Sequence, residues 1–173
     1  MTNSNGLIMI VEDIPAVREL IELQLQARGF STLVARDGQE ALDLLTYQRP
    51  AAIVSDILMP RVDGFSLAHR LRANPQTAMI PLIFLSATYV SQEDETFALN
   101  LGAMRFLPKP VDLEELVSAL NKALQTSDGG PPTLEEREFY FSYRLRLKSK
   151  LQQYAQQIAR TQQQMAAVAE PLR

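Results

Sequence analysis

The amino-acid sequence predicts a doubly wound α/β domain, with a five-stranded parallel sheet, followed by one long C-terminal helix. Three observations support this prediction. Five short apolar runs alternate with amphipathic segments over residues 1–125. The runs that begin at Leu7, Ala51 and Leu82 are apolar without alternation, as strands covered on both faces require. Residues 133–173 then repeat apolar side chains at helical spacing.

The predicted strands are the five apolar runs. In order they are Leu7–Val11, Phe30–Ala35, Ala51–Ser55, Pro81–Leu85 and Met104–Leu107. A helix fits between each run and the next, and a strand–helix alternation repeated five times is typical of a parallel sheet with helices on both faces.

The segments between the runs carry helix start and stop signals. Pro15 suits a first helical position, and Gly29 suits the position after a helix end. The apolar stripe that this first helix would bury consists of Val17, Leu20, Ile21 and Leu25.

Three later helix starts are marked by capping residues. Asp37 and Glu40 have the spacing of a capping box, and so do Asp112 and Glu115. Ser91 precedes three acidic residues, which the helix dipole favours in a first turn.

A linker is predicted at residues 126–132, which read Thr-Ser-Asp-Gly-Gly-Pro-Pro and show no apolar periodicity. The charge changes across it. Residues 1–125 hold 15 acidic and 10 basic side chains, whereas residues 126–173 hold 5 acidic and 7 basic. The predicted domains are therefore residues 1–125 and a long helix over residues 133–173.

The predicted C-terminal helix carries an apolar stripe with alternating spacings of four and three. Its members are Leu147, Leu151, Tyr154, Ile158, Thr161, Met165, Val168 and Leu172. This spacing favours a coiled-coil seam and hence a homodimer. The alternative is a helix packed on its own domain. Seven glutamines between residues 152 and 164 make the segment unusually poor in charge for a coiled coil.

Composition excludes several functional classes. The chain has no cysteine, which rules out a disulfide scaffold and a thiolate zinc site, and its single histidine rules out a histidine-rich metal site. A net charge of −3 argues against direct nucleic-acid binding. The apolar run Leu7–Val11 is too short for a signal peptide or a membrane span, so a cytoplasmic protein without a membrane partner is expected.

Charged and hydroxyl side chains stand where the predicted strands end. Glu12 and Asp13 follow the first strand, Asp56 the third, Ser86 the fourth and Lys109 the fifth. The carboxyl ends of parallel strands share one edge of the sheet, so these side chains are expected to converge. Three acids with one lysine repel one another unless a cation lies among them, and an all-oxygen site with few protein ligands suits Mg²⁺ better than Ca²⁺.

In this order and spacing the motifs resemble the receiver domain of two-component response regulators. The matching segments are Glu12-Asp13, Asp56-Ile57-Leu58-Met59-Pro60 with Asp63-Gly64, Ser86-Ala87 and Lys109-Pro110. The resemblance covers about residues 5–125. It implies a flavodoxin-like fold, similar to the chemotaxis regulator CheY, with strand order 2-1-3-4-5.

The resemblance implies that Asp56 is the phospho-acceptor and takes its phosphoryl group from a sensor histidine kinase or a phosphotransfer protein. It also implies that Mg²⁺ is held by Glu12, Asp13, Asp56 and the main-chain carbonyl of Leu58. Physical chemistry is consistent with these roles, because phosphoryl transfer needs positioning and charge neutralisation more than covalent help.

By the same resemblance, Ser86 bonds one phosphoryl oxygen and Lys109 pairs with another. Ser86 and Phe106 would then form the switch that reports phosphorylation. Serine replaces the commoner threonine at position 86, which keeps the hydroxyl group. Leu58, two residues after the acceptor, is apolar, and its side chain is expected to crowd the path of an attacking water.

The implied function is a signalling switch and not an enzyme, with self-phosphorylation and self-dephosphorylation as its own chemistry. Its output would be relayed by the C-terminal helix, as a dimer or toward a downstream output domain or protein. Two alternatives stay open. One is a receiver-like docking module that is never phosphorylated. The other is a phosphohydrolase of the haloacid-dehalogenase type, whose Asp-x-Asp motif after the first strand is not matched by Glu12-Asp13-Ile14.

Overall fold

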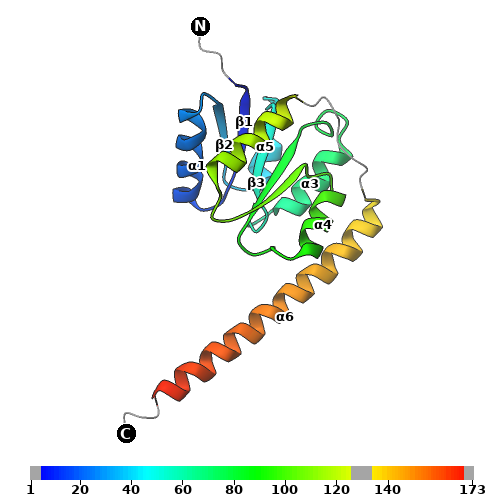
Figure 1. Cartoon of the computed structure of the whole chain (residues 1–173). Helices are drawn as coiled ribbons and strands as arrows, with labels where there is room; N and C mark the ends of the chain where they lie inside the picture. The colour runs from blue at the N-terminus through cyan, green and yellow to red at the C-terminus, as the bar shows by residue number, and fades with distance from the viewer. Residues whose placement is uncertain (1–4, 126–133, 170–173) are drawn as a thin grey trace. The chain divides into compact units, whose positions relative to one another are not determined.

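A five-stranded parallel sheet forms the centre of residues 5–125 in the computed structural model, which describes residues 5–125 and 134–169. Strands and helices alternate along this part of the chain, as predicted (Figure 1). In order they are β1 (Leu7–Val11), α1 (Pro15–Ala27), β2 (Ser31–Ala35), α2 (Gly38–Leu44), β3 (Ala52–Asp56), α3 (Gly64–Ala73), β4 (Leu82–Ser86), α4 (Gln92–Asn100), β5 (Arg105–Pro108) and α5 (Leu113–Gln125).

The strand order is β2-β1-β3-β4-β5, which confirms the predicted topology. Val11 at the end of β1 pairs with Ala35 of β2 on one side and with Ser55 of β3 on the other. The chain therefore leaves β1 in one direction and returns on the opposite side, so the strand order reverses between β1 and β3. Ligands of open parallel sheets bind beyond the carboxyl ends of the strands at this point.

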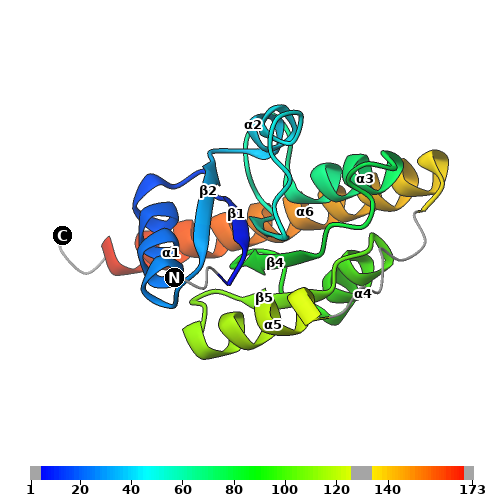
Figure 2. The ribbon, with the colours of Figure 1, turned by 90° about the horizontal axis from the view of Figure 1, so that it is seen from above.

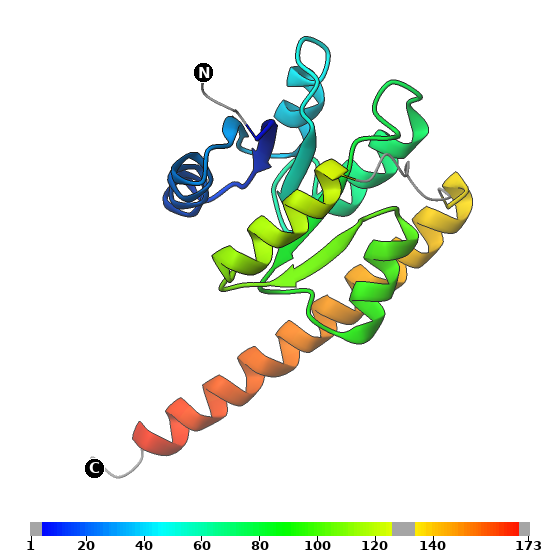
Figure 3. The same ribbon diagram turned by 45° about the horizontal axis from the view of Figure 1, so that its top comes forward.

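Helices cover both faces of the sheet (Figure 2). α1 and α5 pack on one face, and Figure 3 shows α5, in yellow-green, lying over the strands. Ile21 and Leu25 of α1 and Leu116 and Leu120 of α5 join the strand side chains in one buried apolar cluster. Burial of side chains of this size stabilises the fold by roughly 1.5–3 kcal/mol each.

The other face is organised around an aromatic cluster. The centroid of the Phe65 ring in α3 lies 5.6 Å from the ring centroid of Phe84 in β4, 5.0 Å from that of Phe97 in α4 and 5.1 Å from that of Tyr89. All three pairs have edge-to-face geometry. Such pairs contribute roughly 0.5–1.5 kcal/mol beyond their burial. The cluster fixes the start of α3, which immediately follows the loop at the end of β3.

Four strands begin one residue later than predicted, and three also end one residue later. Asp56 and Ser86 are consequently the last residues of β3 and β4, and Asp56 pairs with Leu85 across the sheet. Pairing between strands uses main-chain groups, so a polar side chain at the end of a run does not stop it.

The stripe predicted for α1 is only partly right. Ile21 and Leu25 are buried, but Leu20 is 54% exposed. Successive helical residues are about 100° apart, so Leu20 and Ile21 cannot both face the sheet squarely. Pro15 is the first residue of the helix, and Gly29, with a φ of +84°, follows its end as predicted.

A reciprocal capping box opens α4. The Ser91 hydroxyl accepts the Asp94 N–H and the Asp94 carboxylate accepts the Ser91 N–H, each at 3.2 Å. Asp37 caps α2, but the Glu40 carboxylate accepts the N–H of Arg36, so the reciprocal half of the predicted box is absent there. The N–H of residue 115 likewise donates to the side chain of residue 112.

The second compact unit of the structure contains the helix α6 (Glu136–Ala169). The helix has 34 residues, which corresponds to about 50 Å. Of the predicted stripe, Leu151, Tyr154, Ile158 and Met165 are exposed. The predicted start at residue 133, the linker and residue 172 lie outside the described residues. Across both described segments, no helix combines the length and the apolar character that a membrane span needs.

Candidate phospho-acceptor site

Three carboxylates meet at the carboxyl ends of β1 and β3. Glu12 and Asp13 directly follow β1, and Asp56 is the last residue of β3. One carboxylate oxygen from each of the three lies within 4.8 Å of the others. Glu12 and Asp56 are buried and Asp13 is partly exposed. The structure thus brings together the acidic residues that the sequence places at two neighbouring strand ends.

Lys109, which follows β5, reaches into this acidic cluster. Its Nζ donates to Glu12 Oε2 at 2.6 Å and lies 3.0 Å from Asp56 Oδ2. The Lys109 side chain is only 15% exposed, so both contacts are largely shielded from water. The peptide bond between Lys109 and Pro110 is cis.

Burial and charge shift two pKa values in this cluster. Burial raises the pKa of Glu12 above its ordinary range, and the opposing effect of the Lys109 ammonium does not cancel it. Burial by itself would lower the pKa of Lys109. The hydrogen bond to Glu12 and the charges of Asp56 and Glu12 outweigh burial, so the pKa of Lys109 is raised. Lys109 therefore stays charged at neutral pH.

Main-chain contacts orient the Asp56 carboxylate. Its Oδ1 accepts the Ile57 N–H at 2.7 Å, while Oδ2 faces Lys109. The chain turns tightly behind it, where the Gly64 N–H donates to the Ile57 carbonyl at 2.8 Å. A Cβ atom on Gly64 would lie 2.4 Å from the Asp56 carbonyl oxygen, so this close approach requires glycine.

Ser86 ends β4 and is fully buried. Its hydroxyl oxygen accepts the Tyr89 N–H at 2.9 Å and the Thr88 N–H at 3.2 Å, which holds the turn after the strand. The hydroxyl hydrogen is not used by these two bonds. The predicted site residue therefore lies at the expected edge of the sheet, with its oxygen engaged by the main chain.

A family model described as the response regulator receiver domain matches residues 8–121, which include the acidic cluster and all of the sheet except Leu7. The chain belongs to the response regulator receiver family.

Relatives and solved structures agree with this assignment. The response regulator MprA of Mycolicibacterium vanbaalenii is 39% identical over 125 residues, which are 71% of this chain and 53% of that protein. The receiver domain of a histidine kinase from Syntrophus aciditrophicus is 35% identical with a TM-score of 0.65, covering 75% of this chain and 98% of that one. This chain spans about half the length of the curated relatives it matches.

A third similar structure is the receiver domain of a sensor histidine kinase from Pseudomonas aeruginosa PAO1, which was solved with a magnesium ion coordinated in its active site cleft. It is 30% identical, has a TM-score of 0.64, and covers 70% of this chain and 98% of that one. The donor set of this receiver fits such an ion, because three carboxylates offer hard oxygen ligands beside one compensating lysine.

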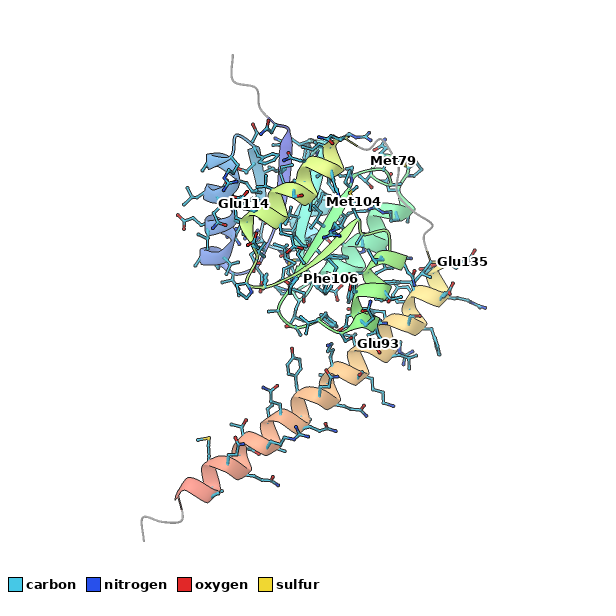
Figure 4. All side chains as sticks on the ribbon, viewed as in Figure 1. Met79, Glu93, Met104, Phe106, Glu114 and Glu135 are labelled. Carbon is cyan, nitrogen blue, oxygen red and sulfur yellow. The ribbon has the colours of Figure 1, made fainter. Side chains whose placement is uncertain are left out.

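Two further predicted residues of the receiver lie on β5 and on the loop after β3. Phe106 is half-buried on β5 and is labelled in Figure 4. Leu58 lies two residues after Asp56 in the β3–α3 loop (Ile57–Asp63), and its side chain is 49% exposed. The main-chain carbonyl predicted as a metal ligand thus belongs to a loop that starts directly after Asp56.

Sequence reasoning missed two arginines around the receiver site. Arg18 of α1 donates from Nη1 to the Glu12 carbonyl at 2.6 Å. Its place one turn after the helix start was a usable signal, because the N-terminus of that helix meets the strand-end edge. Arg61 of the β3–α3 loop pairs with Asp37, the cap of α2. These two residues are 24 positions apart and no spacing rule connects them.

Proposed function

We propose that this receiver accepts a phosphoryl group on Asp56, in a Mg²⁺-dependent reaction, from a sensor histidine kinase or a phosphotransfer protein. One observation carries the proposal. Asp56 has one carboxylate oxygen facing Lys109 and lies with Glu12 and Asp13 in a single acidic cluster at the switch point of the sheet.

In this reaction an Asp56 carboxylate oxygen attacks the phosphorus atom as the bond to the imidazole nitrogen of the donor breaks. Asp56 is held for in-line attack by the Ile57 N–H on one oxygen. Lys109 supplies a compact positive charge beside the transferred group. The Ser86 hydroxyl hydrogen is the donor assigned to a phosphoryl oxygen, which requires the hydroxyl to turn toward Asp56 while the turn at Thr88 and Tyr89 adjusts.

Glu12, Asp13, Asp56 and the Leu58 main-chain carbonyl are the groups assigned to hold Mg²⁺. When bound, the ion neutralises the repulsion between the acceptor carboxylate and the incoming phosphoryl oxygens. The similar Pseudomonas receiver, solved with magnesium in its active site cleft, supports this assignment.

The proposed role is that of a switch, with self-phosphorylation and self-dephosphorylation as its only chemistry. The proposed donor is a histidine kinase that is itself phosphorylated by ATP, and the reaction is therefore proposed to take place in the cytoplasm. The exposed stripe on α6 supports relay of the signal through a homodimer of this helix, or toward a downstream output domain or protein. Ser86 and Phe106 are the proposed switch residues.

Intact mass measurement after incubation with Mg²⁺ and acetyl phosphate tests the proposal. The wild-type chain is expected to gain one phosphoryl group, and Asp56→Asn none. Asp43→Asn, a change at a carboxylate of α2 away from the cluster, serves as the control and is expected to gain the group normally. Equal uptake by Asp56→Asn, or full uptake in EDTA, overturns the assignment. A wild-type chain that never gains the group instead favours the docking-module alternative.

A further inference from the structure

The β3–α3 loop is joined to the start of α2 at two adjacent points. Arg61 donates from Nε to Asp37 Oδ2 at 2.7 Å, and its Nη2 contacts the same oxygen. Beside this ion pair, the Gly38 N–H donates to the Val62 carbonyl at 3.0 Å. Two consecutive residues of one segment therefore hold two consecutive residues of the other, although 24 positions separate Asp37 from Arg61.

The junction is tight and strained. A Cβ atom on Gly38 would lie 2.5 Å from the Val62 carbonyl oxygen, so the two backbones approach as closely as glycine allows. Arg61 has a φ of +62°, which lies in the left-handed region that residues other than glycine rarely adopt. A strained conformation of this kind persists where surrounding contacts favour it, and here the contact is the ion pair with Asp37.

Asp37 is a rigid anchor for the loop. Its side chain is 2% exposed, and its Oδ1 accepts the N–H groups of Gln39 and Glu40 at 2.9 and 3.0 Å. Oδ2 is left to receive Arg61. The carboxylate cannot follow a moving arginine without giving up the cap of α2, so the ion pair fixes the loop and not merely the side chain.

At its other end the loop is held next to the acceptor. The Gly64 N–H donates to the Ile57 carbonyl, and Met59 and Val62 are buried while Leu58 is half-exposed. The segment between these points carries the Leu58 carbonyl, so its path depends on both attachments. Removing the attachment at Arg61 frees the part of the loop that the packing around Gly64 does not fix.

We infer that Asp37 and Arg61 are positioning residues of the phospho-acceptor site: their ion pair holds the β3–α3 loop in the conformation from which the Leu58 carbonyl serves as a metal ligand. This inference rests on the proposed function where it concerns the metal. Arg61 itself is three residues past Leu58 and contacts the α2 cap instead of the carboxylate cluster.

Arg61→Gly separates this role from a structural one. Glycine accepts a positive φ, so the variant removes the ion pair and relieves the backbone strain together, and the fold is expected to remain intact. Arg36→Gln is the control, because Arg36 lies just before Asp37 and pairs with Glu40 of α2 without bonding the loop. Asp37→Asn keeps an acceptor for the cap and removes the charge.

Two measurements on the full chain read out the effect. Amide exchange at Gly38, whose N–H is protected by the Val62 carbonyl, is expected to be faster in Arg61→Gly and unchanged in Arg36→Gln. Titration with Mn²⁺ alone, followed by electron paramagnetic resonance, is expected to show about tenfold weaker binding for Arg61→Gly, as for other residues that support metal ligands. The double variant Asp37→Asn with Arg61→Gly is expected to bind Mn²⁺ no more weakly than the more affected of the two single variants.

Wild-type exchange and wild-type Mn²⁺ binding in Arg61→Gly overturn the inference. Faster exchange with unchanged Mn²⁺ binding also overturns it, since the ion pair then fixes the loop without positioning a ligand. If the wild-type chain binds no Mn²⁺, the proposed metal-dependent function fails, and with it the metal part of the inference. The exchange rates of the variants then still decide whether the pair holds the loop.

Discussion

The Lys109 ammonium group lies between two carboxylates that would otherwise repel each other. Burial raises the pKa of Glu12, and Lys109 acts against this effect through a hydrogen bond and its charge. The same two carboxylates raise the pKa of Lys109. The lysine thus favours the ionised form of the Glu12 carboxylate, which is the form that a metal ion binds.

Replacing Lys109 with methionine is expected to raise the pKa of Glu12 further above its ordinary value of 4.5. A carboxyl group with a higher pKa in the folded than in the unfolded chain binds more protons when folded, so the free energy of unfolding falls as pH rises through the window above 4.5. Urea unfolding without divalent cations is expected to show a steeper fall of the unfolding free energy for Lys109→Met than for wild type as pH rises above 4.5. Parallel profiles would contradict this, and Lys122→Met is the control.

At alkaline pH, the wild-type chain is expected to lose stability that Lys109→Met does not have. A lysine whose pKa is raised by folding contributes stability that is fully present below its ordinary value of 10.5 and is lost as pH rises through the higher folded value. Lys109→Met lacks this loss. Unfolding midpoints at alkaline pH are therefore expected to converge between the two chains as pH rises.

Leu58 offers a test of phosphoryl lifetime. Its half-exposed apolar side chain follows Asp56 by two residues and provides no polar group to orient a water for in-line attack. Leu58→Asn is expected to shorten the lifetime of the aspartyl phosphate, measured by the decay of the phosphorylated mass after removal of the donor. Leu58→Met, which keeps size and polarity, serves as the comparison. An unchanged or longer lifetime in Leu58→Asn would rule out this mechanism.

At the scale of elements, sequence patterns located each strand and most helix starts. Strand existence follows from local apolar runs, whereas strand ends depend on pairing with neighbours, and that is why Asp56 and Ser86 belong to their strands. Caps were predicted where the side chain bonds within its own turn, as at Ser91. The box at Asp37 failed because Glu40 bonds outward to Arg36 instead.

The α4 cap provides a prediction about stability. Ser91→Ala removes the hydroxyl that accepts the Asp94 N–H and is expected to lower the free energy of unfolding by about 1 kcal/mol. Thr96→Ala in the same helix loses a hydroxyl that bonds the Gln92 carbonyl within the helix, and a change within about 0.5 kcal/mol is expected. Urea unfolding measures both. Equal losses would show that the cap contributes nothing particular.

For the molecule as a whole, the topology and the cluster of site residues were predictable for one reason. A parallel sheet gathers all strand ends of one kind at one edge, so residues far apart in sequence become neighbours without any tertiary detail. The pairing of Arg61 with Asp37 was not predictable, because it depends on a loop path and a left-handed residue. No periodic pattern in the sequence connects Arg61 with Asp37.

The proposed dimer of α6 is tested at this scale. Leu151 and Ile158 lie in the exposed stripe, so Leu151→Glu with Ile158→Glu is expected to convert a dimer into a monomer in light scattering. Gln156→Glu with Gln163→Glu adds the same charge on the opposite side of the helix and is expected to leave the dimer intact. A wild-type chain that is monomeric with and without phosphorylation, or a dimer that survives the first pair of changes, would overturn the seam.

The separation of the two edges of the sheet also makes the protein a convenient scaffold for a reporter. The turn after α2, where Tyr47, Gln48 and Arg49 are all exposed, precedes β3 and therefore lies at the edge opposite Asp56. A short peptide tag or a fluorescent label inserted between Gln48 and Arg49 is expected to leave phosphoryl uptake unchanged. Binding of a histidine kinase could then be followed on a labelled chain in which the strand ends around Asp56 are unchanged.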